Sequence, residues 1–261
     1  MRIGNPAMRK VVRRAEAGEV GVDSAPSTYG GIALKSVYFA ALTVVAAIVA
    51  ALLLRYAIAI ESEKLLTSLL IAVGVCALLM IILSLIVVFK PQTVKVVGSM
   101  FAVMQGVTLG VVVYLVDAFF PGVALAAVLG TLIVFGVSVA LNRVLNVRVS
   151  SKVFRVLLVA FVSLLLVQLM MVFYAYVAGI SEVFFRVYFW IQLAASAFCV
   201  IYATVLLMWD LQSASYVVEI GADKSFEWQV AFSLVTTLVY LYIEILELIV
   251  RFAALFGRNN K

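Results

Sequence analysis

Residues 65–89 read LLTSLLIAVGVCALLMIILSLIVVF and contain no charged residue. Charged residues stand close to both ends of this stretch, at Glu63 and Lys64 before it and at Lys90 after it. Roughly 20 apolar residues in an α-helix cross the hydrocarbon core of a bilayer. The stretch therefore predicts a transmembrane helix.

Six further apolar runs predict six more transmembrane helices, at about residues 33–54, 94–115, 122–141, 154–177, 185–209 and 230–255. The composition agrees, because 66% of the residues are hydrophobic, 12% are charged and the mean hydropathy is +1.22. Soluble domains are about 45–50% apolar and about 25% charged. We therefore predict an all-α, polytopic membrane protein with seven transmembrane helices.

The predicted transmembrane domain covers residues 33–256, between a polar, basic tail at 1–32 and a short polar tail at 257–261. The net charge of +6 comes from Lys and Arg in the N-terminal tail and beside the apolar runs, so it indicates a membrane protein and not a nucleic-acid partner. These basic residues are more frequent on the side that holds the N-terminus. By the positive-inside rule, that tail is predicted to be cytoplasmic.

Seven spans and a cytoplasmic N-terminus place the C-terminal tail on the far side of the membrane. Cysteine labelling from outside is expected to reach a probe placed after Asn260 but not a probe at Ala17. The reverse pattern would contradict the orientation. Labelling of both probes from the same side would contradict the number of spans.

An acidic residue, Glu244, lies near the middle of the last apolar run. A charge at the bilayer centre costs at least ~2.5–3.5 kcal/mol, so intramembrane acids usually face protein or a wet cavity. The polar residues around it recur at spacings of three and four, which places them on one helical face. They are Ser233, Thr237, Tyr240, Glu244, Glu247 and Arg251. Glu247 and Arg251 also form an i, i+4 pair that could simply neutralise itself.

A weaker stripe follows the sixth run, through Gln192, Ser196, Cys199, Ala203, Leu206 and Asp210. Small and polar residues on one face are typical of close helix packing. Asp210 stands at the edge of the apolar run, so its position fits a loop-facing acid as well as a functional one. Gln105 and Gln168, inside the third and fifth runs, predict hydrogen bonds between helices.

Several classes of function lack the residues that they need. His is absent, and Cys76 and Cys199 both lie inside apolar runs. A disulfide framework, a zinc site and a His-based triad are therefore unsupported. We expect no enzyme activity and no cofactor, because no nucleophile–base pair or metal cluster is visible. The last run has no Lys that could bind retinal.

Two motifs resemble a known family. Residues 207–212 read LMWDLQ, and residues 240–248 read YLYIEILEL. These are similar to the two acidic motifs of the transmembrane Bax inhibitor motif family. The stretches MRIGNP at 1–6 and GADKSFEW at 221–228 resemble its bacterial, YccA-like branch.

The resemblance implies a seven-helix fold in which the other six helices enclose the last one. It also implies a passive, pH-sensitive calcium leak, gated by the paired acids Asp210 and Glu244. Calcium would then be the permeant ion, with these two carboxyl groups as its binding site, and Thr237, Tyr240, Glu247 and Arg251 would support the gate. The resemblance further implies a location in the bacterial inner membrane.

Two other classes of function stay open. Glu244 could be the coupling site of a proton-coupled carrier, although seven spans divide poorly into two equal halves. The basic N-terminal tail would also suit a non-transporting regulator that binds another membrane protein, such as a membrane protease. Ion flux in liposomes separates transport from regulation, and saturation separates a carrier from a channel.

Overall fold

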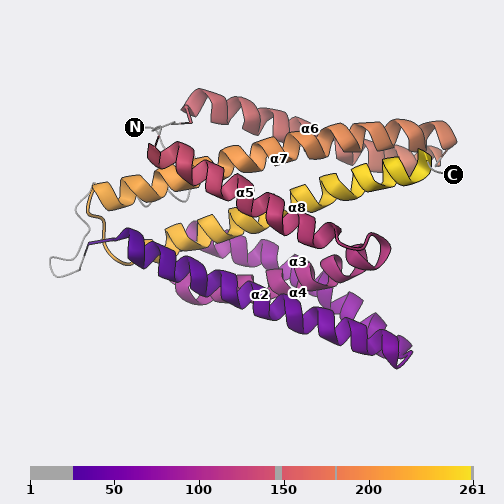
Figure 1. The fold of residues 1–261 in the computed structure, drawn as a ribbon, viewed down its shortest axis with the longest axis horizontal. Helices are drawn as coiled ribbons and strands as arrows, with labels where there is room; N and C mark the ends of the chain where they lie inside the picture. The colour runs from indigo at the N-terminus through magenta and orange to yellow at the C-terminus, as the bar shows by residue number, and fades with distance from the viewer. Residues whose placement is uncertain (1–25, 145–148, 180, 260–261) are drawn as a thin grey trace. The chain divides into compact units, whose positions relative to one another are not determined.

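The computed structural model describes residues 26–144, 149–179 and 181–259. In these ranges the chain is helical, with seven helices long and apolar enough to cross a membrane (Figure 1). The helices are α2 (Tyr29–Ala59), α3 (Glu63–Phe89), α4 (Val94–Phe119), α5 (Val123–Val144), α6 (Ser151–Ala178), α7 (Glu182–Glu219) and α8 (Phe226–Asn259), with a 3-10 turn, η1 (Pro91–Thr93), before α4. The predicted all-α fold with seven membrane-length helices is confirmed.

Most of the helices run beyond the apolar segments that predict them. The largest difference is in α7, which continues to Glu219 and therefore places Asp210 inside a helix, not at its end. α2 already begins at Tyr29, within the segment predicted as a tail. Residues 1–25 of that tail lie outside the described residues. α8 extends to Asn259.

The chain divides into two compact units, and α7 and α8 each contribute to both. The first unit holds α2, α3, α4 and residues 210–236, which form the end of α7 and the start of α8. The second unit holds α5, α6, α7 up to Trp209 and α8 from Thr237 onward. Enclosure of the last helix by the other six stays a prediction, because it depends on both units.

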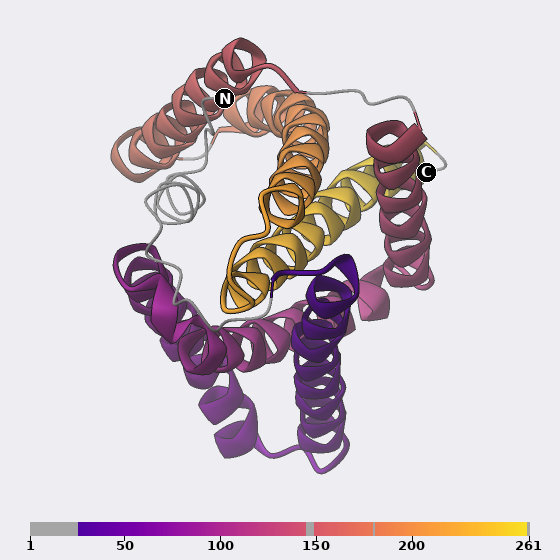
Figure 2. The ribbon, with the colours of Figure 1, turned by 90° about the vertical axis from the view of Figure 1, so that its left-hand side faces the viewer.

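In the first unit α2 packs closely on α4, and Figures 1 and 2 both show α2, α3 and α4 side by side. Two glycines on α4 make this approach possible. A Cβ atom at Gly106 would lie 2.3 Å from the carbonyl oxygen of Thr43, and one at Gly110 would lie 2.1 Å from that of Ala47. Small residues at such positions let membrane helices pack backbone to backbone.

Replacing Gly110 by Ala is expected to destabilise the protein by about 1–3 kcal/mol, because the added methyl group meets the backbone of α2. Thermal unfolding in detergent measures the change. Gly74→Ala on α3 is the matched control, since a Cβ atom there meets nothing within 4 Å. Equal melting temperatures for the two variants would contradict close α2–α4 packing.

Aromatic rings join α2, α4 and the start of α8. Phe39 is fully buried and meets the rings of Trp228 and Phe232 edge-on, with centroids 5.8 and 5.7 Å away. Phe101 of α4 contacts the same Phe232 ring at 5.3 Å. Such edge-to-face pairs add to the free energy of burial. The first turns of α8 are thereby fixed within the first unit.

In the second unit two glutamine side chains join α6 to α7. Gln168 and Gln192 exchange a pair of amide hydrogen bonds of 2.9 and 2.5 Å. The rings of Phe161 and Tyr202 stack between the same two helices at 4.5 Å. The predicted interhelical hydrogen bond of Gln168 is confirmed.

Candidate functional site

Asp210 lies on α7 and faces α8, in the parts of these two helices that belong to the first unit. Its side chain is only 3% exposed, and its Oδ1 atom accepts a 3.0 Å hydrogen bond from the hydroxyl group of Ser233 on α8. Ser233 is also the first member of the polar stripe predicted for the last helix. The carboxyl group of Asp210 therefore faces α8 and not a loop.

Asp210 and Ser233 are opposite positions of a helical hairpin formed by residues 210–233. α7 ends at Glu219, Gly221 follows two residues later with a φ of +63° that suits glycine, and the amide of Ala222 donates to the carbonyl of Val217 at 3.1 Å. This is the usual glycine-terminated helix end. A short turn then leads directly into α8.

Glu244 lies in the second unit, where its side chain is 9% exposed. Among the described residues, Tyr240, Glu247 and Arg251 of its own helix and Cys199 of α7 are polar or charged groups near it. Thr237, one turn before Tyr240, is half-buried on the same helix. Polar side chains of the predicted face therefore lie next to a buried acid.

Arg251 of the polar face makes contacts both within α8 and to α7. Glu247 and Arg251 form the i, i+4 ion pair that their spacing predicts. The guanidinium group of Arg251 also donates to the backbone oxygen of Gln192 at 2.7 Å and to its side-chain oxygen at 3.0 Å. Arg251 therefore ties α8 to α7, and through the amide pair of Gln192 to α6.

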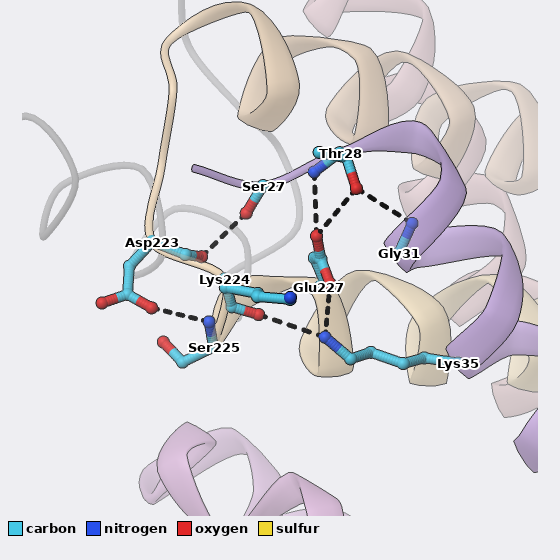
Figure 3. A network of polar contacts seen from close by, with 8 residues as sticks. All are labelled: Ser27, Thr28, Gly31, Lys35, Asp223, Lys224, Ser225 and Glu227. Atoms are coloured by element: carbon cyan, nitrogen blue, oxygen red, sulfur yellow. Dashed lines mark hydrogen bonds and ion pairs between the residues drawn. The ribbon is translucent and has the colours of Figure 1, made fainter. Parts of the chain in front are cut away.

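A further polar cluster was not foreseen from the sequence (Figure 3). Glu227, in the first turn of α8, is fully buried and forms an ion pair with Lys35 of α2. Its Oε1 atom accepts hydrogen bonds from the backbone amide of Thr28 at 2.8 Å and from the Thr28 hydroxyl at 3.3 Å. We call Thr28, Lys35 and Glu227 the clasp.

Neighbouring residues extend the clasp to the turn between α7 and α8. The backbone amide of Ser27 donates to the carbonyl of Ala222, and its hydroxyl donates to that of Asp223, both at 2.7 Å. Lys35 also donates to the carbonyl of Lys224 at 3.3 Å. Figure 2 shows the segment that leads into α2 beside this turn. A signal for the clasp does exist in the sequence, since Lys35 and Glu227 are opposite charges just inside two apolar helices.

Asp210 belongs to the first unit and Glu244 to the second, so their predicted pairing stays a prediction. Within the described ranges no group of three or more His, Cys, Asp or Glu side chains could hold a metal ion. A calcium site made by the two acids likewise stays a prediction.

Seven membrane-length helices with a buried acid in each of the last two define an integral, all-helical membrane protein. The family model described as Bax inhibitor 1 like matches residues 5–254. The chain therefore belongs to the Bax inhibitor 1 like family. The comparison with curated proteins finds no match, and the comparison with solved structures finds none either.

Proposed function

We propose that the protein is a pH-sensitive leak channel for calcium or another cation, gated by Asp210 and Glu244. One observation carries the proposal: both acidic residues are almost entirely buried within apolar helices, at 3% and 9% exposure. Ionisable groups at such positions are costly, and they commonly mark ion pathways or proton relays.

The chemistry of the two acids suits this function. Carboxylate oxygens are preferred ligands of calcium, a hard cation. Two carboxyl groups that approach each other in a medium of low dielectric constant cannot both ionise cheaply, so they tend to share one proton. Loss of that proton would introduce repulsion and a negative charge, which together favour an open, cation-conducting state.

Calcium flux into liposomes that contain the purified protein, measured across a pH series, tests the proposal. The expected result is a flux that depends on pH and rises linearly with the calcium gradient. Protein-free liposomes and the variant Glu219→Gln, which changes an exposed acid at the end of α7, are the controls. Flux no greater than that of protein-free liposomes would contradict a leak. Saturation together with proton coupling would indicate a carrier that uses Glu244.

A non-transporting regulator is the second candidate function. The N-terminal segment carries Arg9, Lys10, Arg13 and Arg14, a density of positive charge that suits docking to an acidic surface of another membrane protein, such as a protease. We also propose a bacterial inner membrane location, on the basis of the resemblance to the bacterial branch of the family, and a cytoplasmic N-terminus, on the basis of the positive-inside bias. Absence of flux in the liposome experiment would favour the regulator.

A further inference from the structure

The clasp surrounds a carboxylate that has little access to water. Glu227 is 0% exposed, and its oxygens are occupied by the ammonium group of Lys35 and by two hydrogen bonds from Thr28. A buried charge is tolerated only when it is paired and hydrogen-bonded. The carboxylate also lies at the N-terminal ends of both α2 and α8, where helix dipoles favour a negative charge.

Gly31 of α2 leaves room for this carboxylate, because it has no Cβ atom. A Cβ atom at Gly31 would lie 2.2 Å from Oε2 and 2.3 Å from Oε1 of Glu227. At the preceding residue, Gly30, a Cβ atom would meet nothing within 4 Å. Glycine at position 31 is therefore required by the clasp, whereas glycine at position 30 is not.

The clasp and Asp210 are linked by the helical hairpin 210–233. The clasp holds the tip of this hairpin, where α8 begins. Asp210 and Ser233 form a hydrogen bond farther along the hairpin. Ser233 lies seven residues after Phe226, the first residue of α8, which is about 10 Å along the helix axis at 1.5 Å per residue. The clasp and its neighbours hold the first turn of α8 and the turn before it against the start of α2, so their loss frees the start of α8 to shift relative to α7, and this hydrogen bond can then break.

We propose that the clasp is a positioning device for Asp210, which keeps the hairpin closed and the carboxyl group held by Ser233. Release of the clasp opens the hairpin and exposes Asp210. The inference deepens the proposed function and rests on it for its consequence, because opening the hairpin then increases the leak. Thr28, Lys35 and Glu227 are positioning residues, and they do not touch the permeant ion.

The test compares Gly31→Ala with its matched control, Gly30→Ala, in the full-length protein. The probe is a water-soluble carbodiimide with glycine ethyl ester in mildly acidic buffer, which couples to carboxyl groups that water reaches, and mass spectrometry maps the labelled residues. We expect Asp210 to be labelled on the order of tenfold faster in Gly31→Ala and at the parental rate in Gly30→Ala. Labelling of Glu244, in the second unit, should not change. The calcium leak of Gly31→Ala should rise with the labelling of Asp210.

Three results would overturn the inference. Asp210 could keep its parental labelling rate in Gly31→Ala, or Asp210 and Glu244 could rise together, which would mean general loosening. Faster labelling without any change in a leak that the parental protein does carry would also contradict it. If the parental protein carries no leak, the proposed function fails, and the labelling rates still decide whether the clasp positions Asp210.

A milder variant keeps the test valid if Gly31→Ala does not fold. Ser27→Ala removes the 2.7 Å hydrogen bond to the carbonyl of Asp223 and leaves Glu227 fully paired. The expected increase in Asp210 labelling is smaller, about threefold, because a single hydrogen bond is lost. No increase in this folded variant would contradict the inference.

Discussion

Replacing Lys35 by Met is expected to destabilise the protein by about 3–5 kcal/mol, because it leaves the fully buried carboxylate of Glu227 without its cation. The methionine side chain fills a similar volume, so the loss reports mainly on charge. Unfolding in mixed detergent micelles measures the free energy. Lys95→Met is the matched control, since the Lys95 ammonium group also contacts the ring of Trp228, at 5.5 Å, but is exposed. Its effect should stay below about 1 kcal/mol.

The double variant Lys35→Met with Glu227→Gln sharpens this prediction. The amide of Gln can still accept the hydrogen bonds from Thr28, and no unpaired charge remains. We therefore expect the double variant to be more stable than Lys35→Met alone, with a coupling energy of about 0.5–3 kcal/mol between the two positions. Additive losses would mean that the two side chains do not act as a pair.

The clasp illustrates what sequence patterns leave out. Lys35 and Glu227 are 192 residues apart in the chain. Periodicity assigns a residue to a helical face, but it does not say which distant helix covers that face. In the sequence, Lys35 is only one of several basic residues near the ends of the apolar runs. The ion pair depends on the hairpin turn beside the start of α2, which is a property of tertiary packing.

Contacts within one helix, and the stripes themselves, were easier to predict. The pair of Glu247 and Arg251 follows from i, i+4 spacing, and a polar side chain such as Gln168 in an apolar helix needs a partner. The additional contact from Arg251 to Gln192 was not foreseen, because spacing within α8 does not identify the residue of another helix that lies beside Arg251.

Helix ends were predicted less well than helix centres. The sixth apolar run was expected to end at Trp209, where its hydropathy falls, yet α7 continues for more than two further turns. No Pro or Gly interrupts the chain from Trp209 until Gly221, and the helix ends at Glu219, just before this left-handed glycine. The glycine-terminated turn therefore sets the end of this helix.

The pH response of calcium flux is expected to disappear when either Asp210 or Glu244 is neutralised. Asp210→Asn retains an oxygen that can accept the hydrogen bond from Ser233, and Glu244→Gln retains the shape of the side chain. Both variants should therefore fold while losing a titrating group. Flux in liposomes across a pH series, with Glu219→Gln as the control, provides the measurement.

The double variant decides whether the two acids act as one gate. If they share a proton, removing either acid abolishes the repulsion that drives opening, and removing both does little more than the stronger single change. The expected signature is a coupling energy of about 0.5–3 kcal/mol, or roughly two- to 150-fold in flux. Independent acids would instead give effects that multiply. In that case Asp210 would act through Ser233 within the hairpin, Glu244 would act through the polar face of α8, and the shared-proton gate would be wrong. A pH response that persists in Glu244→Gln would remove Glu244 from the mechanism altogether.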